Sequence, residues 1–458
     1  MESFKKLSIG FYGGTGSVTG ANFLVSYGNS KFLVDCGLLQ GTALADKENW
    51  DPFLYDPKQI EILFITHAHI DHIGRIPKLY AEGFRGRIIS TDATRDLASV
   101  MLADTVQILG KSDDYNLSKI YTTAAISEIS KLWEGFSYHT SVHVKDNFNV
   151  IFKDSGHILG SAMLEMRVEG KIIIFTGDLG NSPSPLLRDT EEILHADYII
   201  MESVYGDRNH EHRDERKDRL IQVIEDNYRR KGTLIIPTFS LERTQELLFE
   251  INDLVEHKRI SSQPIFLDSP LGIHLTDVFK KYVRYFNDTA QAVFKSDKDL
   301  FSFPGLQVTL ETEESKHILS APNPKIIIAG SGMSNGGRII HHERSYLPDP
   351  NNTILLAGYQ SMGTLGRLIE EGAKEVTILR EAVPVRAHIE KISGYSGHKD
   401  MDHLIEFVEN IGGTIKKVFV VMGEPKSSLF LSQRLRDYVG VDARAPNFGD
   451  VATINLDE

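Results

Sequence analysis

The stretch THAHIDHIGR (residues 66–75) brings four metal-type side chains together, namely His67, His69, Asp71 and His72. It follows EILFI, an apolar run typical of a buried strand, and precedes IPKLYAEGF, which has helical spacing. His67 and His69 are two positions apart, so their rings can reach one ion, and Asp71 and His72 can turn toward a second. Burying four such polar side chains between a strand and a helix would cost free energy unless they bind a metal or another partner. We therefore predict a metal centre here, and the ligand types suit zinc.

The same arrangement recurs outward from this stretch. A polar residue follows an apolar run at Asp35 (FLVDCG), at Asp178 (IIIFTGDLG) and at Glu202 (YIIMES), and His157 lies in a glycine-rich loop, SGHILGSA. Strand exits are where α/β architectures assemble their sites. We expect His157 to complete the first ion's ligands and Asp178 to bridge both ions. Two bridged ions about 3.5–4 Å apart form a hydrolytic centre suited to phosphoryl or acyl transfer.

Composition limits the alternatives. The chain has 458 residues, 41% of them hydrophobic, which predicts a globular α/β protein of two domains. Its net charge of −13 argues against coating nucleic acid with the whole surface, but leaves a local basic cleft open. Cys36 is the single cysteine, so a multi-thiolate metal site is excluded. The sequence shows no signal peptide and no apolar run of membrane-spanning length, so we expect a cytoplasmic protein without a membrane partner.

The composition of the sequence changes after Glu202. The mixed-charge stretch DRNHEHRDERKDR (residues 207–219) indicates a solvated segment and a domain boundary near 207. A second alternation of strands and helices then runs to about residue 375, after which loops carrying His or acidic residues return. The predicted division is 1–206, 207–375 and 376–458.

These motifs together resemble a known family. HAHIDH, SGHILGSA and TGDLG, preceded by Asp35, are similar to the motif series of the metallo-β-lactamase superfamily. IPTFSLERTQELL, IFLDSP, GSGMSNGGRIIHH, GYQSMGTLGR and SGYSGHKD extend the resemblance to its β-CASP branch over essentially the whole chain. The resemblance implies an α/β fold: an αββα sandwich (1–206 and 376–458) interrupted by a β-CASP domain (207–375).

The resemblance also implies an activity. Members of this branch are mainly nucleases, and the closest in pattern are bacterial and archaeal ribonucleases related to the cleavage and polyadenylation endonuclease. We thus expect a zinc-dependent endoribonuclease that uses metal-bound hydroxide and leaves 5′-phosphate and 3′-hydroxyl ends, with an added 5′-to-3′ exonuclease activity left open. By analogy Asp35 orients the histidine loop, Asp71 belongs to the catalytic set, and His398, paired with Glu202, protonates the leaving oxygen. A homodimer is also left open.

Candidate contacts to the nucleic-acid backbone lie in GSGMSNGGRIIHH (residues 330–342). A buried strand enters a glycine-rich turn whose amides, at Ser331 and Gly332, could face an anion. Arg338 and His341 follow on a predicted helix and join the candidates. For Arg367 in GTLGR a phosphate contact and an internal salt bridge are equally favoured.

One position departs from the family pattern. Ribonuclease members usually carry a histidine before Gly-Glu near the carboxy terminus as a ligand of the second ion, whereas VVMGEP places Met422 there. A thioether is a poor zinc ligand, so we expect the second ion to be held by Asp71, His72, Asp178 and water, and weakly. His388 as a replacement is disfavoured, because an alternating strand predicts that it lies on the surface.

Three alternatives stay open, two of them because of Met422. DNA-processing members also lack that histidine, which favours a DNA-directed nuclease, acting for instance on single-stranded DNA. A nucleic-acid-binding scaffold with weakened catalysis is the second alternative. The third is a small-molecule metallo-hydrolase, against which the β-CASP-like insertion argues, since a small substrate does not need it.

Overall fold

The structure is a computed structural model that describes residues 5–41, 47–110, 115–210, 215–361, 363–412 and 415–457. Contacts divide the chain into two compact units. Unit 1 comprises 1–184, 188–209 and 398–458, and unit 2 comprises 185–187 and 210–397. Unit 2 extends beyond residue 375 because β19 (His388–Lys391) pairs in parallel with β16 (Thr353–Leu356) of its sheet. The assignment of 207–375 and 376–458 to family domains remains a prediction.

Unit 1 contains two seven-stranded sheets, each completed by strands from the carboxy-terminal part of the chain. The first has the order β22-β1-β2-β3-β4-β5-β6 and the second β21-β20-β11-β10-β9-β8-β7. The strands of the first are β1 (Lys6–Phe11), β2 (Phe23–Tyr27), β3 (Ser30–Val34), β4 (Ile60–Phe64), β5 (Arg87–Thr91), β6 (Trp133–Phe136) and β22 (Val451–Asn455). Those of the second are β7 (Ser141–Lys145), β8 (Phe148–Asp154), β9 (Ala162–Val168), β10 (Lys171–Phe175), β11 (Tyr198–Met201), β20 (Lys417–Val420) and β21 (Ala443–Arg444).

The two sheets of unit 1 pack face to face over one apolar core. Phe11, Phe32 and Phe64 from the first sheet share this core with Phe152 and Phe175 from the second, and all are buried. Alternation along each strand sends these side chains inward. The two sheets are therefore the middle two layers of this unit.

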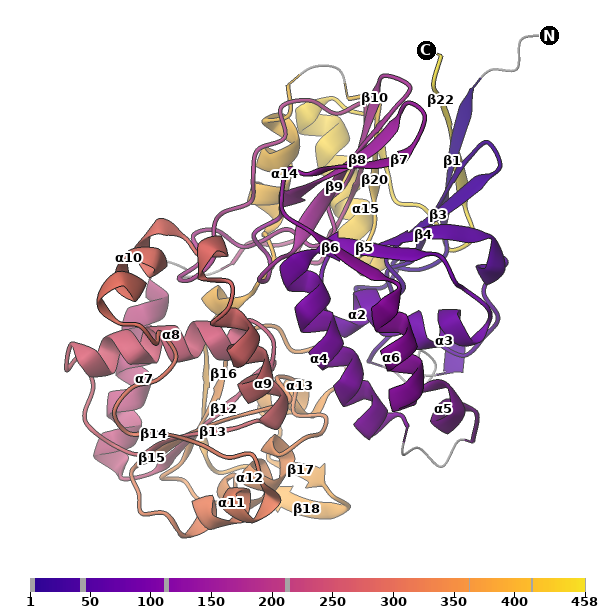
Figure 1. Ribbon diagram of the computed structural model, residues 1–458. Helices are drawn as coiled ribbons and strands as arrows, with labels where there is room; N and C mark the ends of the chain where they lie inside the picture. Colours follow the sequence, from indigo (N-terminus) through magenta and orange to yellow (C-terminus); the bar gives the residue numbers. More distant parts are fainter. Residues whose placement is uncertain are drawn as a thin grey trace. The chain divides into compact units, whose positions relative to one another are not determined.

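Helices cover the outer faces of the sandwich (Figure 1). The first sheet carries α4 and α6, and the second carries α14 and α15, whose Leu404 and Leu431 pack on its outer face. The helical segments of unit 1 are η1 (Pro57–Gln59), α2 (Ile70–Ile73), α3 (Ile76–Ala81), α4 (Asp92–Ile108), α5 (Tyr115–Ile120), α6 (Thr123–Lys131), α14 (Met401–Glu409), α15 (Pro425–Arg434) and η6 (Leu435–Val439). The layer order is αββα, which confirms the predicted fold class.

Unit 2 is built on a parallel six-stranded sheet of order β14-β13-β15-β12-β16-β19, with a separate hairpin, β17-β18. The strands KIIIA and TLIIP are buried throughout, as expected for parallel strands covered on both faces. Its strands are β12 (Thr233–Pro237), β13 (Ile265–Asp268), β14 (Leu306–Val308), β15 (Lys325–Ala329), β16, β17 (Glu375–Ile378), β18 (Glu381–Pro384) and β19. Its helical segments are α7 (Arg216–Arg230), α8 (Arg243–Glu256), α9 (Pro270–Phe279), η3 (Val283–Tyr285), α10 (Asp288–Ser296), α11 (Thr312–His317), η4 (Ile318–Ser320), α12 (Ile339–Tyr346), α13 (Leu365–Glu370) and η5 (Ser393–Tyr395).

Strand ends position the polar residues that the sequence singled out. Asp35 directly follows β3, Glu202 directly follows β11, and Asp178 lies three residues past the end of β10. His67 follows β4, and His157 lies in the loop between β8 and β9. Among the described residues, no helix is both long and apolar enough to cross a membrane.

Candidate metal centre and active site

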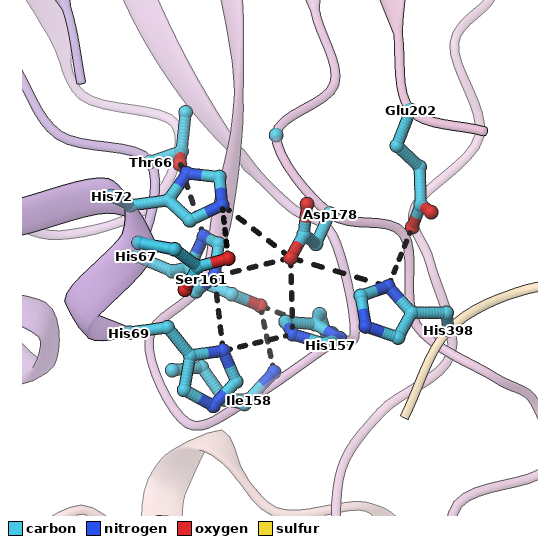
Figure 2. Close-up of polar contacts among 12 residues, drawn as sticks. Thr66, His67, His69, His72, His157, Ile158, Ser161, Asp178, Glu202 and His398 are labelled. Carbon is cyan, nitrogen blue, oxygen red and sulfur yellow. Dashed lines mark hydrogen bonds and ion pairs between the residues drawn. The ribbon is translucent and has the colours of Figure 1, made fainter. Parts of the chain in front are cut away.

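Four side chains of unit 1 converge on one point (Figure 2). His67, His69, His157 and Asp178 each present one ligand atom, and these atoms all lie within 4.8 Å of one another. His69 Nδ1 lies 3.1 Å from His67 Nε2 and 3.2 Å from His157 Nε2. Three imidazoles that turn ring nitrogens toward one another beside a carboxylate form a donor set suited to a zinc-type cation.

Asp71 and His72 extend the group on the other side of Asp178. His72 Nε2 lies 3.5 Å from Asp178 Oδ2 and 3.9 Å from Asp71 Oδ2. His72 Nε2 and Asp178 Oδ1 are buried and make no hydrogen bond among the described residues. Buried polar atoms of this kind ordinarily have a partner. The unsatisfied atoms and the ligand types therefore fit a bound cation.

Burial and neighbouring charges set the protonation of this cluster. Burial lowers the pKa of His69 well below its usual value, and the nearby rings of His67 and His157 lower it further. Burial alone would raise the pKa of Asp178, but interactions with the imidazoles of His72 and His67 outweigh it and lower that pKa strongly. A neutral imidazole and an ionised carboxylate are the forms that bind metal.

Asp35 holds the histidine segment from behind. Its carboxylate accepts hydrogen bonds of 2.8 Å from both the amide and the hydroxyl of Thr66, and it lies 2.8 Å from His72 Nδ1. Asp35 has a φ of 58°, a conformation that Asp tolerates better than most residues. These contacts fix the orientation of His72 and leave its Nε2 directed at Asp178. Thr66 was not among the predicted residues.

Two further residues shape the loops of the centre. A Cβ on Gly37 would lie 1.4 Å from the carbonyl oxygen of Asp71, so only glycine permits this close approach of the two loops. Ser161 Oγ accepts hydrogen bonds from the amides of His157, at 3.0 Å, and Ile158, at 3.2 Å. Ser161 thus holds the loop that carries His157. The glycine and serine residues that flank His157 in SGHILGSA are the sequence feature that predicts this loop.

Glu202 and His398 meet beside the cluster. His398 Nδ1 lies 3.2 Å from Glu202 Oε1 and 4.0 Å from Asp178 Oδ2 (Figure 2). The fully buried Glu202 also accepts a 2.7 Å hydrogen bond from the amide of Leu179, so its carboxylate is fixed. Residue Gly180 forms a β-bridge with His398, which fixes the histidine backbone.

The electrostatics of this pair favour a protonated ring. Burial alone would lower the pKa of His398, but Glu202, then Asp178 and Asp71, outweigh it and raise the pKa to about 9. Burial raises the pKa of Glu202 above its usual value, although His398 opposes this effect. At neutral pH the described residues therefore present His398 as a proton donor held by a carboxylate.

Known proteins resemble this chain over nearly its whole length. A ribonuclease of Thermus thermophilus is 35% identical over 93% of this chain and 95% of its own length. An RNase J-like protein of Methanocaldococcus jannaschii is 30% identical over 97% of this chain and 99% of its own length. The chain belongs to the β-CASP ribonuclease family of metallo-β-lactamase fold. It is accordingly a metal-dependent hydrolytic enzyme.

Family models match the β-CASP chain in three parts. A Beta-Casp domain matches 244–369, a Zn-dependent metallo-hydrolase RNA specificity domain matches 382–446, and the anti-Pycsar protein Apyc1 matches 13–215. The transcription termination factor FttA of Methanosarcina mazei is 28% identical over 94% of this chain and 69% of its own length. A crystal structure of a protein of unknown function from Enterococcus faecalis aligns with a TM-score of 0.57, at 12% identity, over 98% of this chain and 100% of its own. That likeness concerns the fold alone.

Met422 lies in the apolar core of unit 1. Its side chain is 2% exposed and belongs to the apolar cluster between the two sheets. Its Sδ packs on Gly14, where a Cβ would lie 2.4 Å from the sulfur. Met422 and His72 line the same small cavity, together with Glu202. A buried, core-packed thioether is consistent with the expectation that Met422 is no ligand, which remains a prediction.

The predicted substrate contacts lie in unit 2. Arg338 is committed to internal partners: its guanidinium donates to the buried Asp268 at 2.6 Å and to the carbonyl of Thr309 at 2.9 Å. His342, beside the predicted His341, also lies 2.7 Å from the Asp268 carboxylate. These contacts tie α12 to the end of β13, a structural role that the sequence did not indicate. A phosphate contact by Arg338 remains a prediction.

The other predicted contacts are more accessible. Arg367 donates to Glu371 at 2.7 Å, and a third of its side chain is exposed. Of its two predicted roles, the internal salt bridge is therefore present among the described residues. His341 is exposed on α12, and Ser331 is half-buried, accepting a 3.1 Å hydrogen bond from the amide of Asn335. Gly332 is buried. His388 is exposed at the start of β19, where the sequence placed it on the surface.

Proposed function

We propose that this protein is a zinc-dependent ribonuclease that hydrolyses phosphodiester bonds of RNA. The observation that carries the proposal is the adjacency, within unit 1, of the histidine and aspartate cluster and the Glu202–His398 pair, which share Asp178. A cation site for an activated water next to a carboxylate-held histidine provides both parts of phosphodiester hydrolysis. The ribonuclease relatives and the matched RNA specificity domain favour RNA as the polymer.

Two zinc ions are part of the proposal. His67, His69 and His157 would hold one, Asp71 and His72 the other, and Asp178 would bridge them. Such ions, when bound, lower the pKa of a coordinated water and offset negative charge on the phosphate oxygens. The second set offers fewer histidines, and its His72 shares a small cavity with Met422 where a further histidine was expected, so we expect the weaker affinity there.

The chain's own residues supply the remaining chemistry. His398 would protonate the leaving oxygen, and Glu202 would hold the ring in the donating orientation through the 3.2 Å contact at Nδ1. Because Nδ1 faces Glu202, the proton given to the leaving oxygen would be the one on Nε2. Asp35 would act indirectly, by orienting His72.

Several finer properties belong to the same proposal. We expect internal cleavage, products with 5′-phosphate and 3′-hydroxyl ends, and a cytoplasmic location. The 5′-to-3′ exonuclease mode, single-stranded DNA as substrate and a homodimer are alternatives. DNA is favoured by one observation, namely Met422 at the position where ribonuclease members usually carry a histidine.

The test uses the full chain with end-labelled RNA and DNA of the same sequence, with and without chelator. We expect zinc-dependent RNA cleavage that is lost in Asp71→Ala and reduced by about 10²–10⁴ in His398→Ala. His143→Ala, which removes an exposed histidine of the same unit, is the matched control and should cleave like the parent. Metal-independent behaviour, or no cleavage of RNA, would refute the proposal, and cleavage of DNA alone would establish the alternative.

Metal analysis of the same preparation counts the ions. Two ions of unequal affinity are expected. Two equally tight zinc ions would contradict the weak second site.

A further inference from the structure

Phe239 is an exposed aromatic ring that the proposed chemistry does not use. It lies two residues past β12, with 38% of its surface exposed, in the loop that leads into α8. Its carbonyl accepts hydrogen bonds from the amide of Thr244, at 3.2 Å, and from the Thr244 hydroxyl, at 2.8 Å. The backbone that carries the ring is therefore fixed.

A glycine supports the ring from one side. A Cβ built on Gly332 would lie 2.7 Å from Cδ2 and 3.0 Å from Cε2 of Phe239. Any side chain at this position would therefore displace the ring or the loop. Phe239 is packed on the backbone of the glycine-rich turn, while more than a third of its surface stays open. A supported ring with an open part is a rigid apolar platform.

The surroundings of the ring are small and polar. β12, β13 and β15 run parallel and adjacent, so the loops that follow them meet at one edge of the sheet (Figure 1). Ser240 Oγ lies 3.1 Å from Ser269 Oγ in two of these loops, and a Cβ on Gly330 would lie 3.1 Å from Ser240 Oγ. Ligands of parallel sheets bind at this edge. The loops at this edge therefore present small residues, serines and glycines, beside the ring.

We propose that Phe239 is a stacking platform for an unpaired nucleobase of the RNA substrate. Every base has a π-face that can stack on an aromatic ring, and the adjoining glycine-rich turn would accommodate the backbone of the same nucleotide. A base can lie on the ring only if it is not stacked within a duplex, so the platform selects single-stranded segments. This inference rests on the proposed function and specifies its substrate class.

The experiment measures binding of a fluorescein-labelled single-stranded RNA by anisotropy. The full-length, zinc-loaded His398→Ala protein serves as the parent, so that the RNA is not consumed. Phe239→Ala and Phe239→Leu should each raise Kd by about 5- to 150-fold, the usual range for loss of one base stack, whereas Phe239→Trp should bind at least as tightly. Phe448→Ala, which removes a ring that is 64% exposed in unit 1, is the matched control and should leave Kd unchanged. Thermal melting of each variant reports its folding.

A scan of RNAs with one abasic nucleotide tests the contact itself. At one position the abasic RNA should weaken binding of the parent as much as Phe239→Ala does, and combining the two changes should cost nothing more. Gly332→Ala should reproduce the loss by displacing the ring, although Phe239 itself is retained. A matching RNA duplex should bind without dependence on Phe239.

Each outcome decides the inference. The inference is overturned if Phe239→Ala or Phe239→Leu binds single-stranded RNA as tightly as the parent. It is also overturned if the losses are additive at every abasic position, or if binding of duplex RNA depends on Phe239 to the same extent. Cleavage by the protein with His398 intact is measured separately. If the protein binds RNA in a Phe239-dependent way but does not cleave it, the proposed function is refuted and the platform stands. If it cleaves RNA and the Phe239 substitutions do not change binding, the platform alone is refuted.

Discussion

Asp35→Asn is the substitution that most directly tests how the histidine segment is held. Asn tolerates the φ of 58° at this position and keeps the size of the side chain. Its Oδ1 can still accept from the Thr66 amide, but its Nδ2 must donate where the carboxylate accepted. His72 Nδ1, 2.8 Å away, then becomes an acceptor, and the ring proton moves to Nε2. That atom faces Asp178 at 3.5 Å and cannot bind metal while it carries a proton.

The expected loss is specific to one ion. Removing a partner that orients a ligating histidine weakens metal affinity by about 10- to 100-fold, or roughly 1.4–2.7 kcal/mol. Zinc titration of the metal-free protein by calorimetry should show this loss at the weaker site alone, because His67, His69 and His157 keep their contacts. Asp56→Asn, the same change of charge at an exposed helix cap, is the control. Unchanged affinity at both sites in a folded Asp35→Asn protein would refute this account of Asp35.

Three further predictions concern buried side chains. Met422→His should strengthen the weaker zinc site by at least about tenfold in titrations and lower the melting temperature of the metal-free chain, because it adds a ligand but buries a polar ring; no change in zinc affinity would contradict the assignment. Burial raises the pKa of Glu343 from 4.5 to about 7, so the folded chain binds more protons than the unfolded chain in this window and stability falls as pH rises through it. Urea unfolding at pH 5 and pH 8 should therefore show Glu343→Gln gaining on the parent by up to about 3 kcal/mol, and parallel pH profiles would disprove the effect. Tyr395→Phe removes the hydroxyl that donates to the buried Glu250 and should lower the free energy of unfolding by about 1–3 kcal/mol, whereas a stability equal to the parent's would show that the bond contributes nothing.

The convergence of the histidines and carboxylates could be predicted because its signals are local. His67 and His69 follow an apolar strand, and Asp178 and Glu202 follow two others, so a parallel or face-packed arrangement of strands brings them to one edge. The family resemblance, and not the alternation of apolar runs, implies the layer order of unit 1. That alternation predicts an α/β unit after residue 207 but does not specify the parallel sheet of unit 2. The sequence could not give the pairing of β22 with β1, which joins the two ends of the chain, because strand partners that far apart leave no periodic signal.

The supporting contacts could not be predicted for a different reason. Arg338 follows a glycine-rich turn and remains a predicted phosphate contact, but its ion pair with Asp268, 70 residues earlier, leaves no signal in the sequence. Thr66 and Ser161 act through single hydroxyls, which are too common to stand out. Phe239 lies in an apolar run in which nothing distinguishes a platform from a core residue; only its exposure and its contact with Gly332 do so.

The chain order of the two sheets in unit 1 has a consequence for synthesis on the ribosome. A nascent chain that has emerged as far as Glu202 already carries all six proposed metal ligands, but β20, β21 and β22 have not yet been made, so neither sheet is complete. His398 is also missing, since the whole of 210–397 must be translated first. Domains fold as units during translation, so the second unit can form while the first still waits for its last strands. On the proposed mechanism, a chain that ends before His398 therefore lacks its proton donor, and one that ends before β22 lacks a complete first sheet, so RNA cleavage requires translation of nearly all of these residues.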